Sequence, residues 1–294
     1  MEQLTQILVT GATGIAGWHV ANALEQRGFH ALRVARRPDW TGQRLDLTDR
    51  ESIERLPAYA GVVHCAGLTP RAAPSWDELC QVNVEGTVML AEDALRRGAG
   101  FFVYLSTRGR LGRRNSASRA TRLYVLSKYL AERRLRGLLR GKAPGLSLRA
   151  ASLYGEHDHG SMSRLVRGIA LGRFILPTVG DTPKCLLYAG TLADAIAQEV
   201  AAESPEPWRA RGIADLRTYT LREIVGAIES ALGRTVPRIP LSAAMISRVS
   251  VLRNLRDARS LRERSSSSPR RLRLHSRRSG AARTISFGIA VGRT

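Results

Sequence analysis

Tyr124 and Lys128 are the residues whose types and spacing point most directly to chemistry. They lie four residues apart in a stretch with a helical apolar pattern, so both side chains are expected on one face of a helix. An ammonium group near a phenol favours the phenolate and lowers the pKa of the phenol. A tyrosine tuned in this way can exchange a proton with a substrate alcohol near neutral pH.

Three glycines, Gly11, Gly14 and Gly17, follow a short apolar run at residues 7–9 and precede a helical pattern. Such a turn can hold a phosphate group, because glycine lets the backbone approach closely and the start of a helix favours negative charge. The spacing is G-x-x-G-x-x-G, which departs from the common G-x-G-x-x-G. A glycine turn without a ligand is the alternative, but the flanking strand and helix favour a dinucleotide site.

The region after the expected second strand, residues 31–35, indicates which dinucleotide is preferred. An acid about 20 residues past the first glycine usually holds the ribose 2′-hydroxyl of NAD. Here the region offers Arg33, Arg36 and Arg37. Because arginine can pair with a 2′-phosphate, the sequence favours NADP over NAD. The alternative is that these arginines are solvated loop charges.

A third strand is predicted at Leu45 and Leu47, with Asp46 at its end near the expected position of an adenine. We assign Asp46 and Leu47 to the cofactor site. Asp49 is expected to cap the next helix, because aspartate is a preferred N-cap residue.

Two further strands are predicted to end at the ligand-binding edge of the sheet, where the carboxyl ends of parallel strands gather. Ala66 and Gly67 follow the apolar run that contains His64, and Thr107 follows the run at residues 101–105. We expect Ala66 and Gly67 to face the cofactor, and Thr107 to lie at the same edge of the sheet. His64 lies inside its apolar run, which favours a packed core histidine over a catalytic one.

The alternation of strands and helices predicts an α/β fold with a doubly wound parallel sheet. The chain has 294 residues, of which 44% are hydrophobic. That is enough for one large domain or two smaller ones. We expect a dinucleotide-binding domain over residues 1–150, a smaller substrate-binding lobe over 151–250 and a basic tail over 251–294.

The cysteines and the apolar runs bear on the cellular compartment. The three cysteines are scattered, without a metal-binding spacing or a disulfide framework, which fits a reducing cytosol. We expect no metal site. No apolar run approaches the roughly 18 residues of a membrane span, and no charged-then-apolar leader follows Met1. The expected location is the cytoplasm, with no membrane partner.

The formal net charge of +21 raises the possibility of a nucleic-acid partner. The charge is concentrated near the end of the chain, where thirteen arginines and two acids follow residue 247, and lysine occurs only three times. Arginine used almost alone is typical of a GC-rich gene, so we disfavour nucleic acid as a partner. The Arg/Ser-rich segment is expected to be disordered. A frame shift near residue 250 would produce it; the alternative is a genuine basic tail that binds RNA or an acidic surface.

Six short motifs follow one another along residues 5–240. They are Thr10-Gly-Ala-Thr-Gly-Ile-Ala-Gly17, His64-Cys-Ala-Gly67, Asn83-Val-Glu-Gly-Thr87, Ser106-Thr-Arg-Gly-Arg-Leu-Gly112, the Tyr124/Lys128 pair and Arg149-Ala-Ala-Ser-Leu-Tyr-Gly155. In this order they resemble the motifs of the extended short-chain dehydrogenase/reductase family, in its NAD-dependent epimerase/dehydratase branch, which acts on nucleotide sugars.

This resemblance implies a Rossmann-type sheet, a homodimer and hydride transfer between a nicotinamide and a sugar carbon. It implies that Tyr124 is the acid/base, that Lys128 holds the nicotinamide ribose and tunes the tyrosine, and that Thr107 hydrogen-bonds the reacting oxygen. The residues expected to contact the cofactor are Gly11, Thr13, Gly14, Ile15, Gly17, Arg36, Arg37, Asp46, Leu47, Ala66, Gly67, Tyr124 and Lys128.

The substrate is expected to be a nucleotide-linked sugar, with Arg164 and Arg173 either meeting its diphosphate or serving as solvated helix charges. The interval between Thr107 and Tyr124 is shorter than usual in such enzymes, and Leu111 replaces an aromatic residue. These departures keep two alternatives open: a carbonyl reductase acting on a smaller ketone, and a cofactor-binding regulator without turnover.

The substrate-binding lobe shows two further signals. The stretch from Gly172 to Asp181 resembles the segment of this family that crosses the nucleotide-sugar pocket. Thr220 and Glu223 form the pattern of a capping box, which predicts a helix that runs to Leu232 and stops at Gly233.

Overall fold

A computed structural model of the chain describes residues 5–37, 42–70, 75–109, 118–177, 183–202, 207–239 and 289–292. It contains two compact units. The first comprises Met1–Arg164, Cys185–Thr218 and Gly288–Thr294, and the second comprises Leu165–Lys184 and Tyr219–Phe287. The division into a dinucleotide-binding domain, a substrate-binding lobe and a tail, with boundaries at residues 150 and 250, stays a prediction.

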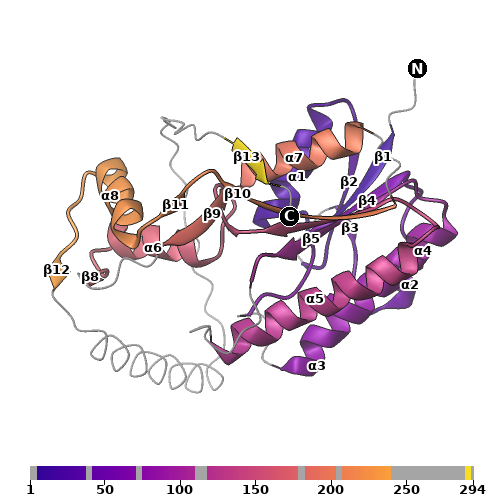
Figure 1. The fold of residues 1–294 in the computed structure, drawn as a ribbon, viewed down its shortest axis with the longest axis horizontal. Helices are drawn as coiled ribbons and strands as arrows, with labels where there is room; N and C mark the ends of the chain where they lie inside the picture. Colours follow the sequence, from indigo (N-terminus) through magenta and orange to yellow (C-terminus); the bar gives the residue numbers. More distant parts are fainter. Residues whose placement is uncertain are drawn as a thin grey trace. The chain divides into compact units, whose positions relative to one another are not determined.

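The first unit is built on an eight-stranded sheet with the order β13-β10-β6-β5-β4-β1-β2-β3 (Figure 1). Seven strands pair in parallel and β13 alone pairs antiparallel, with β10. The predicted parallel α/β fold is therefore confirmed. The strands are β1 (Gln6–Thr10), β2 (His30–Ala35), β3 (Gln43–Arg44), β4 (Gly61–His64), β5 (Phe102–Thr107), β6 (Gly145–Ala150), β10 (Trp208–Asp215) and β13 (Ile289–Gly292).

Helices cover both faces of this sheet (Figure 1). On one face, α1 (Ile15–Glu25) packs against α7 (Ala189–Ala201) over a shared apolar core. On the other face, α2 (Arg50–Glu54), α4 (Gly86–Arg96) and α5 (Arg119–Leu139) form a second core with the sheet. The layers are those of a doubly wound fold.

The central strand β1 contributes to both cores. Ile7 and Val9 join the core beneath α1 and α7, whereas Leu8 joins the core beneath α4 and α5. Successive side chains of a strand point to opposite faces, so a strand buried on both faces is apolar throughout. This is why residues 7–9 form an unbroken apolar run.

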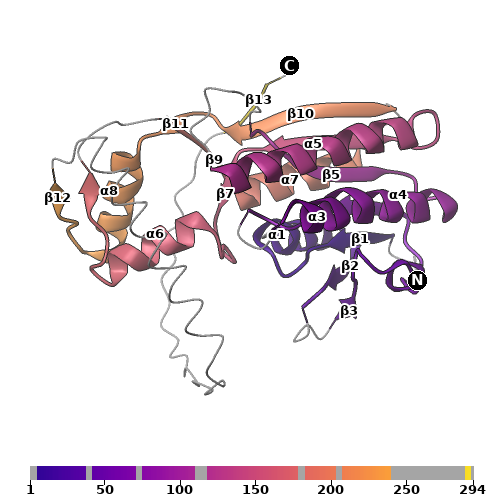
Figure 2. The ribbon, with the colours of Figure 1, turned by 90° about the horizontal axis from the view of Figure 1, so that it is seen from below.

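Residues 76–96 form three consecutive helical segments, of which the first and the last are labelled in Figure 2. They are α3 (Trp76–Leu79), the π-helical segment η1 (Cys80–Glu85) and α4. A capping box between Ser75 and Glu78 starts the run. The apolar periodicity of this stretch does not distinguish the π-helical segment from a regular α-helix. Such segments often occur at functional sites.

The third strand lies earlier than predicted. It is confined to Gln43–Arg44, and Leu45 and Leu47 are buried just after it, in irregular structure. Burial of the two leucines, not a strand, accounts for their alternation. The predicted cap of α2 is confirmed, because the Asp49 side chain accepts a hydrogen bond from the backbone N–H of Glu51 at 3.0 Å.

In the expected tail, the structure describes only the backbone of β13, which pairs with β10 at the edge of the sheet. A strand at this point was not expected from the sequence. The remaining positions of residues 251–294, together with residues 110–112 and 178–181 of the family-like stretches, lie outside the described residues.

A small three-stranded sheet has the order β11-β9-β7 and contains β7 (Ser152–Tyr154), β9 (Lys184–Tyr188) and β11 (Thr218–Tyr219). The second unit contains the later part of α6 (Ser161–Ala170), which packs against α8 (Leu221–Leu232).

A two-stranded parallel sheet of β8 (Leu176–Pro177) and β12 (Arg238–Ile239) accompanies α6 and α8. The predicted capping box of α8 is confirmed. Thr220 and Glu223 bond reciprocally, and Gly233 ends the helix in a left-handed conformation with φ 60°.

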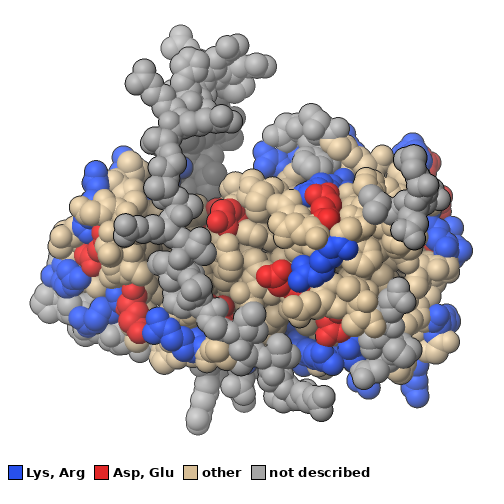
Figure 3. Space-filling view, turned by 90° about the horizontal axis from the view of Figure 1, so that it is seen from above, with Lys and Arg blue, Asp and Glu red and all other residues tan. Residues whose placement is uncertain are grey.

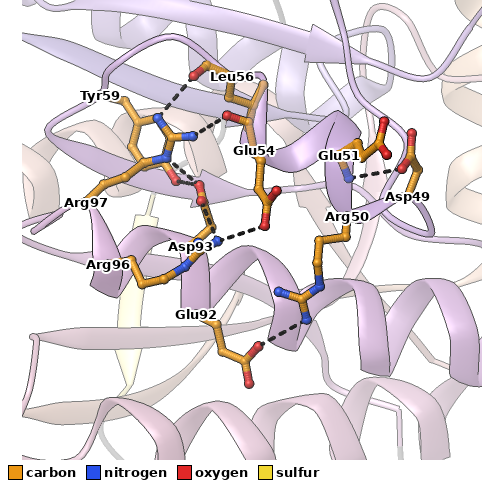
Figure 4. Close-up of polar contacts among 10 residues, drawn as sticks. All are labelled: Asp49, Arg50, Glu51, Glu54, Leu56, Tyr59, Glu92, Asp93, Arg96 and Arg97. Atoms are coloured by element: carbon orange, nitrogen blue, oxygen red, sulfur yellow. Dashed lines mark hydrogen bonds and ion pairs between the residues drawn. The ribbon is translucent and has the colours of Figure 1, made fainter.

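A buried carboxylate ties α4 to the α2–β4 loop in the first unit (Figure 4). Asp93 accepts hydrogen bonds from the Tyr59 hydroxyl at 2.8 Å and from Arg97 Nε at 2.6 Å. Arg97 also donates to the carbonyl oxygens of Leu56 and Glu54. Burial and the neighbouring carboxylate raise the pKa of the Tyr59 phenol.

Basic and acidic side chains are interspersed on the described part of the face shown in Figure 3. Several exposed arginines pair with acids, as Arg55 does with Asp49 and Glu51. None of the helices in the described residues is long and apolar enough to cross a membrane.

Candidate active site

A pocket of about 550 Å³ lies at the carboxyl ends of β1, β2, β4, β5 and β6 in the first unit. It brings together all the residues expected at the cofactor and at the reacting carbon. They are Gly11, Thr13, Gly14, Ile15, Gly17, Arg36, Arg37, Asp46, Leu47, Ala66, Gly67, Thr107, Tyr124 and Lys128. The individual roles of these residues stay predictions.

The glycine turn forms one wall of the pocket and has no room for a side chain at Gly11 or Gly17. Gly11 adopts φ +69°, and a Cβ there would lie 2.9 Å from the backbone of Ala66. A Cβ at Gly17 would lie 2.3 Å from the carbonyl oxygen of Gly11, so α1 can start this close to the turn only with glycine. Gly14 caps α1 without a side-chain hydrogen bond to its first N–H groups. This cradle fits the pyrophosphate of a dinucleotide.

Arginines at the end of β2 mark the part of the pocket expected to hold the adenosine. Arg36 and Arg37 line the pocket, and Arg36 is exposed. Arg33 is held elsewhere, since its guanidinium bonds to Asn22 at 2.6 Å and to Glu25 at 2.7 Å. Its pairing on the surface of α1 removes it from the group that the sequence offered to a 2′-phosphate.

Asp46 lines the same part of the pocket. Its carboxylate accepts hydrogen bonds from the backbone N–H of Thr48 at 2.9 Å and from the Thr48 hydroxyl at 2.7 Å. Burial opposes ionisation, but these bonds and the charges of Arg36 and Arg44 lower the pKa of the Asp46 carboxyl overall. The residue is therefore a fixed anion beside the arginines.

Thr107 and Tyr124 reach the pocket from different elements. Thr107 ends β5, and its hydroxyl accepts a hydrogen bond from the backbone N–H of Gly109 at 3.2 Å. Tyr124 lies on α5, one helical turn before Lys128. Both hydroxyls border one space, together with the apolar side chains of Leu68 and Leu105.

The electrostatics of Tyr124 differ from the expectation. Burial raises the pKa of the Tyr124 phenol to about 12, with no compensating contribution from the ammonium group of Lys128. Burial also lowers the pKa of Lys128 to about 8, although Cys65 and Glu132 act in the opposite direction. Removal from water dominates at both residues, a factor that spacing on a helix does not reveal.

A buried asparagine connects the β4 turn to α5. Asn83 of η1 accepts a hydrogen bond from Leu68 N–H at 2.7 Å and donates to the Leu68 carbonyl oxygen and to Ser127 Oγ, both at 3.0 Å. Ser127 in turn donates to the carbonyl oxygen of Tyr124 at 2.8 Å. Asn83 belongs to a family-like motif, but its position in the sequence did not predict these contacts.

Glu132 and Arg149 form an ion pair next to the pocket that sequence reasoning missed. The Glu132 carboxylate is 8% exposed and lies 2.5 Å from the Arg149 guanidinium. Burial opposes ionisation, but the hydrogen bonds from Arg149 and its positive charge lower the pKa of the Glu132 carboxyl overall. Glu132 lies four residues after Lys128 on the same helix, and this spacing was the signal in the sequence that places Glu132 near the site.

His64 is a core residue, as predicted. It is fully buried, with ring nitrogens 2.7 Å from Thr10 Oγ1 and 2.9 Å from Thr87 Oγ1. Burial lowers the pKa of the imidazole to about 3.

The two arginines expected at a substrate diphosphate are not part of this pocket as described. Arg164 is exposed on α6 and does not line it. Arg173 is exposed in the second unit. A substrate role for either residue stays a prediction.

Comparison with known proteins identifies the family. The model of the NAD-dependent epimerase/dehydratase family matches residues 7–208. The chain is 27% identical to the ceramide reductase of Caulobacter vibrioides, over 77% of this chain and 70% of that protein. It is 26% identical to the 2-alkyl-3-oxoalkanoate reductase of Stenotrophomonas maltophilia, over 80% of this chain and 77% of that protein.

The fold is that of solved epimerases. The structure of UDP-glucose 4-epimerase from Thermus thermophilus in complex with NAD superposes with a TM-score of 0.66, at 22% identity, over 81% of this chain and 86% of that one. The motif order, the parallel sheet and the family match agree. The chain belongs to the NAD-dependent epimerase/dehydratase family and is an oxidoreductase with a Rossmann-type fold.

Proposed function

We propose that this protein is an NADPH-preferring reductase that converts a ketone with apolar substituents into an alcohol. The observation that carries the proposal is that one pocket is bordered by the glycine turn, by Arg36 and by the side chains of Thr107, Tyr124 and Lys128. The pocket thus combines a dinucleotide cradle with groups that can handle a proton at a carbonyl oxygen.

The residues around the pocket fit a dinucleotide along its whole length. The turn from Gly11 to Gly17 would hold the pyrophosphate, Arg36 and Arg37 the 2′-phosphate, and Lys128 the nicotinamide ribose. The bound cofactor supplies the hydride. Cationic side chains at the 2′-position favour NADPH over NADH, because charge-assisted hydrogen bonds to phosphate are strong.

The proton chemistry is assigned to Tyr124. In the reduction, the carbonyl carbon gains a hydride and the carbonyl oxygen takes the phenolic proton of Tyr124, which leaves an alcohol and a phenolate. Thr107 donates a hydrogen bond to the same oxygen. Because burial raises the pKa of the Tyr124 phenol, Tyr124 is protonated at neutral pH, which is the form that a general acid requires. The ammonium group of Lys128 is assigned to the nicotinamide ribose.

The choice of substrate rests on the lining of the pocket and on the relatives. Leu68, Leu105 and Leu153 line the same pocket as Thr107 and Tyr124. Two relatives are named as reductases, one of them as a 2-alkyl-3-oxoalkanoate reductase. An apolar 3-oxo acid or its ester is the substrate class that these observations favour.

A nucleotide-linked sugar is the second candidate substrate. The stretch that begins at Gly172 resembles the sugar-nucleotide segment of the family, which favours this reading. Such a substrate would be epimerised or oxidised rather than reduced as a simple ketone.

A cofactor and substrate panel tests the proposal. Purified protein is assayed with NADPH and NADH against 2-alkyl-3-oxo esters, and separately with UDP-sugars under product analysis. Tyr124→Phe is expected to lower ketone reduction by about 10²–10⁴-fold, because it removes the general acid. Tyr129→Phe, on the same helix but 51% exposed, serves as the matched control and is expected to retain activity. Turnover of UDP-sugars without ketone reduction, or equal loss in both variants, would refute the proposal.

A further inference from the structure

Tyr104 holds Lys128 at two points. The Lys128 ammonium nitrogen lies 4.2 Å from the centroid of the Tyr104 ring, and the Tyr104 hydroxyl donates to the carbonyl oxygen of Lys128 at 3.4 Å. Tyr104 lies on β5 and is fully buried, and it does not line the pocket. Its contact with the site therefore runs through Lys128.

The burial of Lys128 strengthens its contact with the Tyr104 ring. Lys128 is only 4% exposed, so its ammonium group has lost most of its water. A cation above an aromatic face within about 6 Å is attracted by the ring, most strongly where it is desolvated. The ring thus replaces part of the missing hydration of the ammonium group.

The other titratable groups near Lys128 are either paired elsewhere or uncharged, so they do not replace the contact with the Tyr104 ring. Glu132, one turn along α5, favours the charged lysine but is already paired with Arg149. The thiol of Cys65, just after β4, keeps its proton, because burial raises its pKa to about 12. His64, at the end of β4, stays neutral at physiological pH. Tyr124, on the same helix, retains its proton as well.

We propose that Tyr104 is a positioning residue whose aromatic face keeps the Lys128 ammonium protonated and fixed at the pocket. The consequence for turnover rests on the proposed function. The state of the lysine itself does not, so the two ideas can fail separately.

The test uses the low lysine content of the protein. Because Lys128, Lys142 and Lys184 are the only lysines, lysine labelled with ¹³C at the ε-carbon gives three NMR signals. Lys128→Arg assigns the signal of interest, and the exposed Lys142 and Lys184 provide internal references. The titration midpoint of Lys128 is then measured directly, without substrate or turnover.

Three variants separate the ring from its surroundings. Tyr104→Phe keeps the ring and is expected to leave the Lys128 midpoint within a few tenths of a pH unit. Tyr104→Leu removes the ring and is expected to lower the midpoint by about one unit, because a desolvated cation–π contact contributes on that scale. Phe102→Leu is the matched control, since Phe102 is equally buried in the same core, two residues earlier on β5.

A shape-conserving change covers the case in which Tyr104→Leu does not fold. Pentafluorophenylalanine at position 104 keeps the size of the ring but reverses the charge of its face, so the midpoint should again fall relative to Tyr104→Phe. The proposal is overturned if removing or fluorinating the ring leaves the midpoint unchanged. It is also overturned if Phe102→Leu shifts the midpoint as much as Tyr104→Leu.

Kinetics then connect the contact to function. If ketone reduction is observed, its decline at alkaline pH should begin about one unit lower in Tyr104→Leu than in Tyr104→Phe. An equal decline in both variants would contradict the positioning role. If the protein reduces no ketone, the proposed function fails, but the lysine titration still decides the inference.

Discussion

Replacing Asp93 by alanine is expected to destabilise the first unit by about 2–4 kcal/mol. The Asp93 side chain is 3% exposed and accepts hydrogen bonds from Tyr59, Arg96 and Arg97 (Figure 4). Without it, the Tyr59 hydroxyl lies unsatisfied in the core, where such a group costs about 1–3 kcal/mol. Arg97 keeps its bonds to two carbonyl oxygens and Arg96 is 55% exposed, so their losses together add about 1 kcal/mol.

The assay is urea unfolding followed by tryptophan fluorescence, since Trp18, Trp76 and Trp208 all lie in the first unit. Glu92→Ala provides the matched control. Glu92 precedes Asp93 on α4 but is 43% exposed, with a single ion pair of 3.9 Å to Arg50. Its loss is expected to change the free energy of unfolding by less than about 0.5 kcal/mol.

A double-mutant cycle tests whether the unsatisfied Tyr59 hydroxyl accounts for the loss of stability. In the background of Tyr59→Phe no buried hydroxyl is left unsatisfied, so Asp93→Ala should cost about 1–2 kcal/mol less than in the wild type. The account is refuted if the cost is the same in both backgrounds. It is also refuted if Asp93→Ala and Glu92→Ala destabilise equally.

Three further outcomes are expected. Arg36→Ala should weaken the binding of NADPH relative to NADH by about tenfold or more, as measured by fluorescence titration. Replacement of the exposed Arg55 by alanine should leave this selectivity unchanged. Equal selectivity in both variants would contradict the 2′-phosphate assignment. Because the pKa of His64 is about 3 in the folded protein against 6.5 unfolded, the unfolded state binds the extra proton in this range. The free energy of unfolding should therefore fall as pH drops from 6.5 towards 3. Urea unfolding of His64→Gln should show a weaker dependence on pH. Parallel pH curves for the variant and the wild type would contradict the assignment of this dependence to His64. Asn83→Ala should expose the amide of Leu68 to rapid hydrogen exchange, and retained protection would show that the Asn83 bond is dispensable.

The sequence determined the fold class and the positions that form the pocket. The apolar run at residues 7–9, the glycines at Gly11 and Gly17, and the Tyr124/Lys128 pair are local patterns with local physical causes. A strand buried on both faces must be apolar, a turn against a helix start needs glycine, and four residues make one helical turn. Parallel strands then bring their carboxyl ends to one edge, so the expected residues meet there.

Other properties of the protein depend on long-range contacts and on burial, which arise only in the folded chain. The pairing of Arg33 with Glu25, the burial of Asp93 and the contact between Tyr104 and Lys128 join residues whose relation is invisible in the sequence pattern. The pKa of Tyr124 illustrates the difference. Helical spacing predicted a lowered value from a neighbouring charge, whereas burial raises it to about 12. Spacing determines which residues are neighbours, but the removal of water depends on every element packed around them, and this removal determines the charge that each group carries.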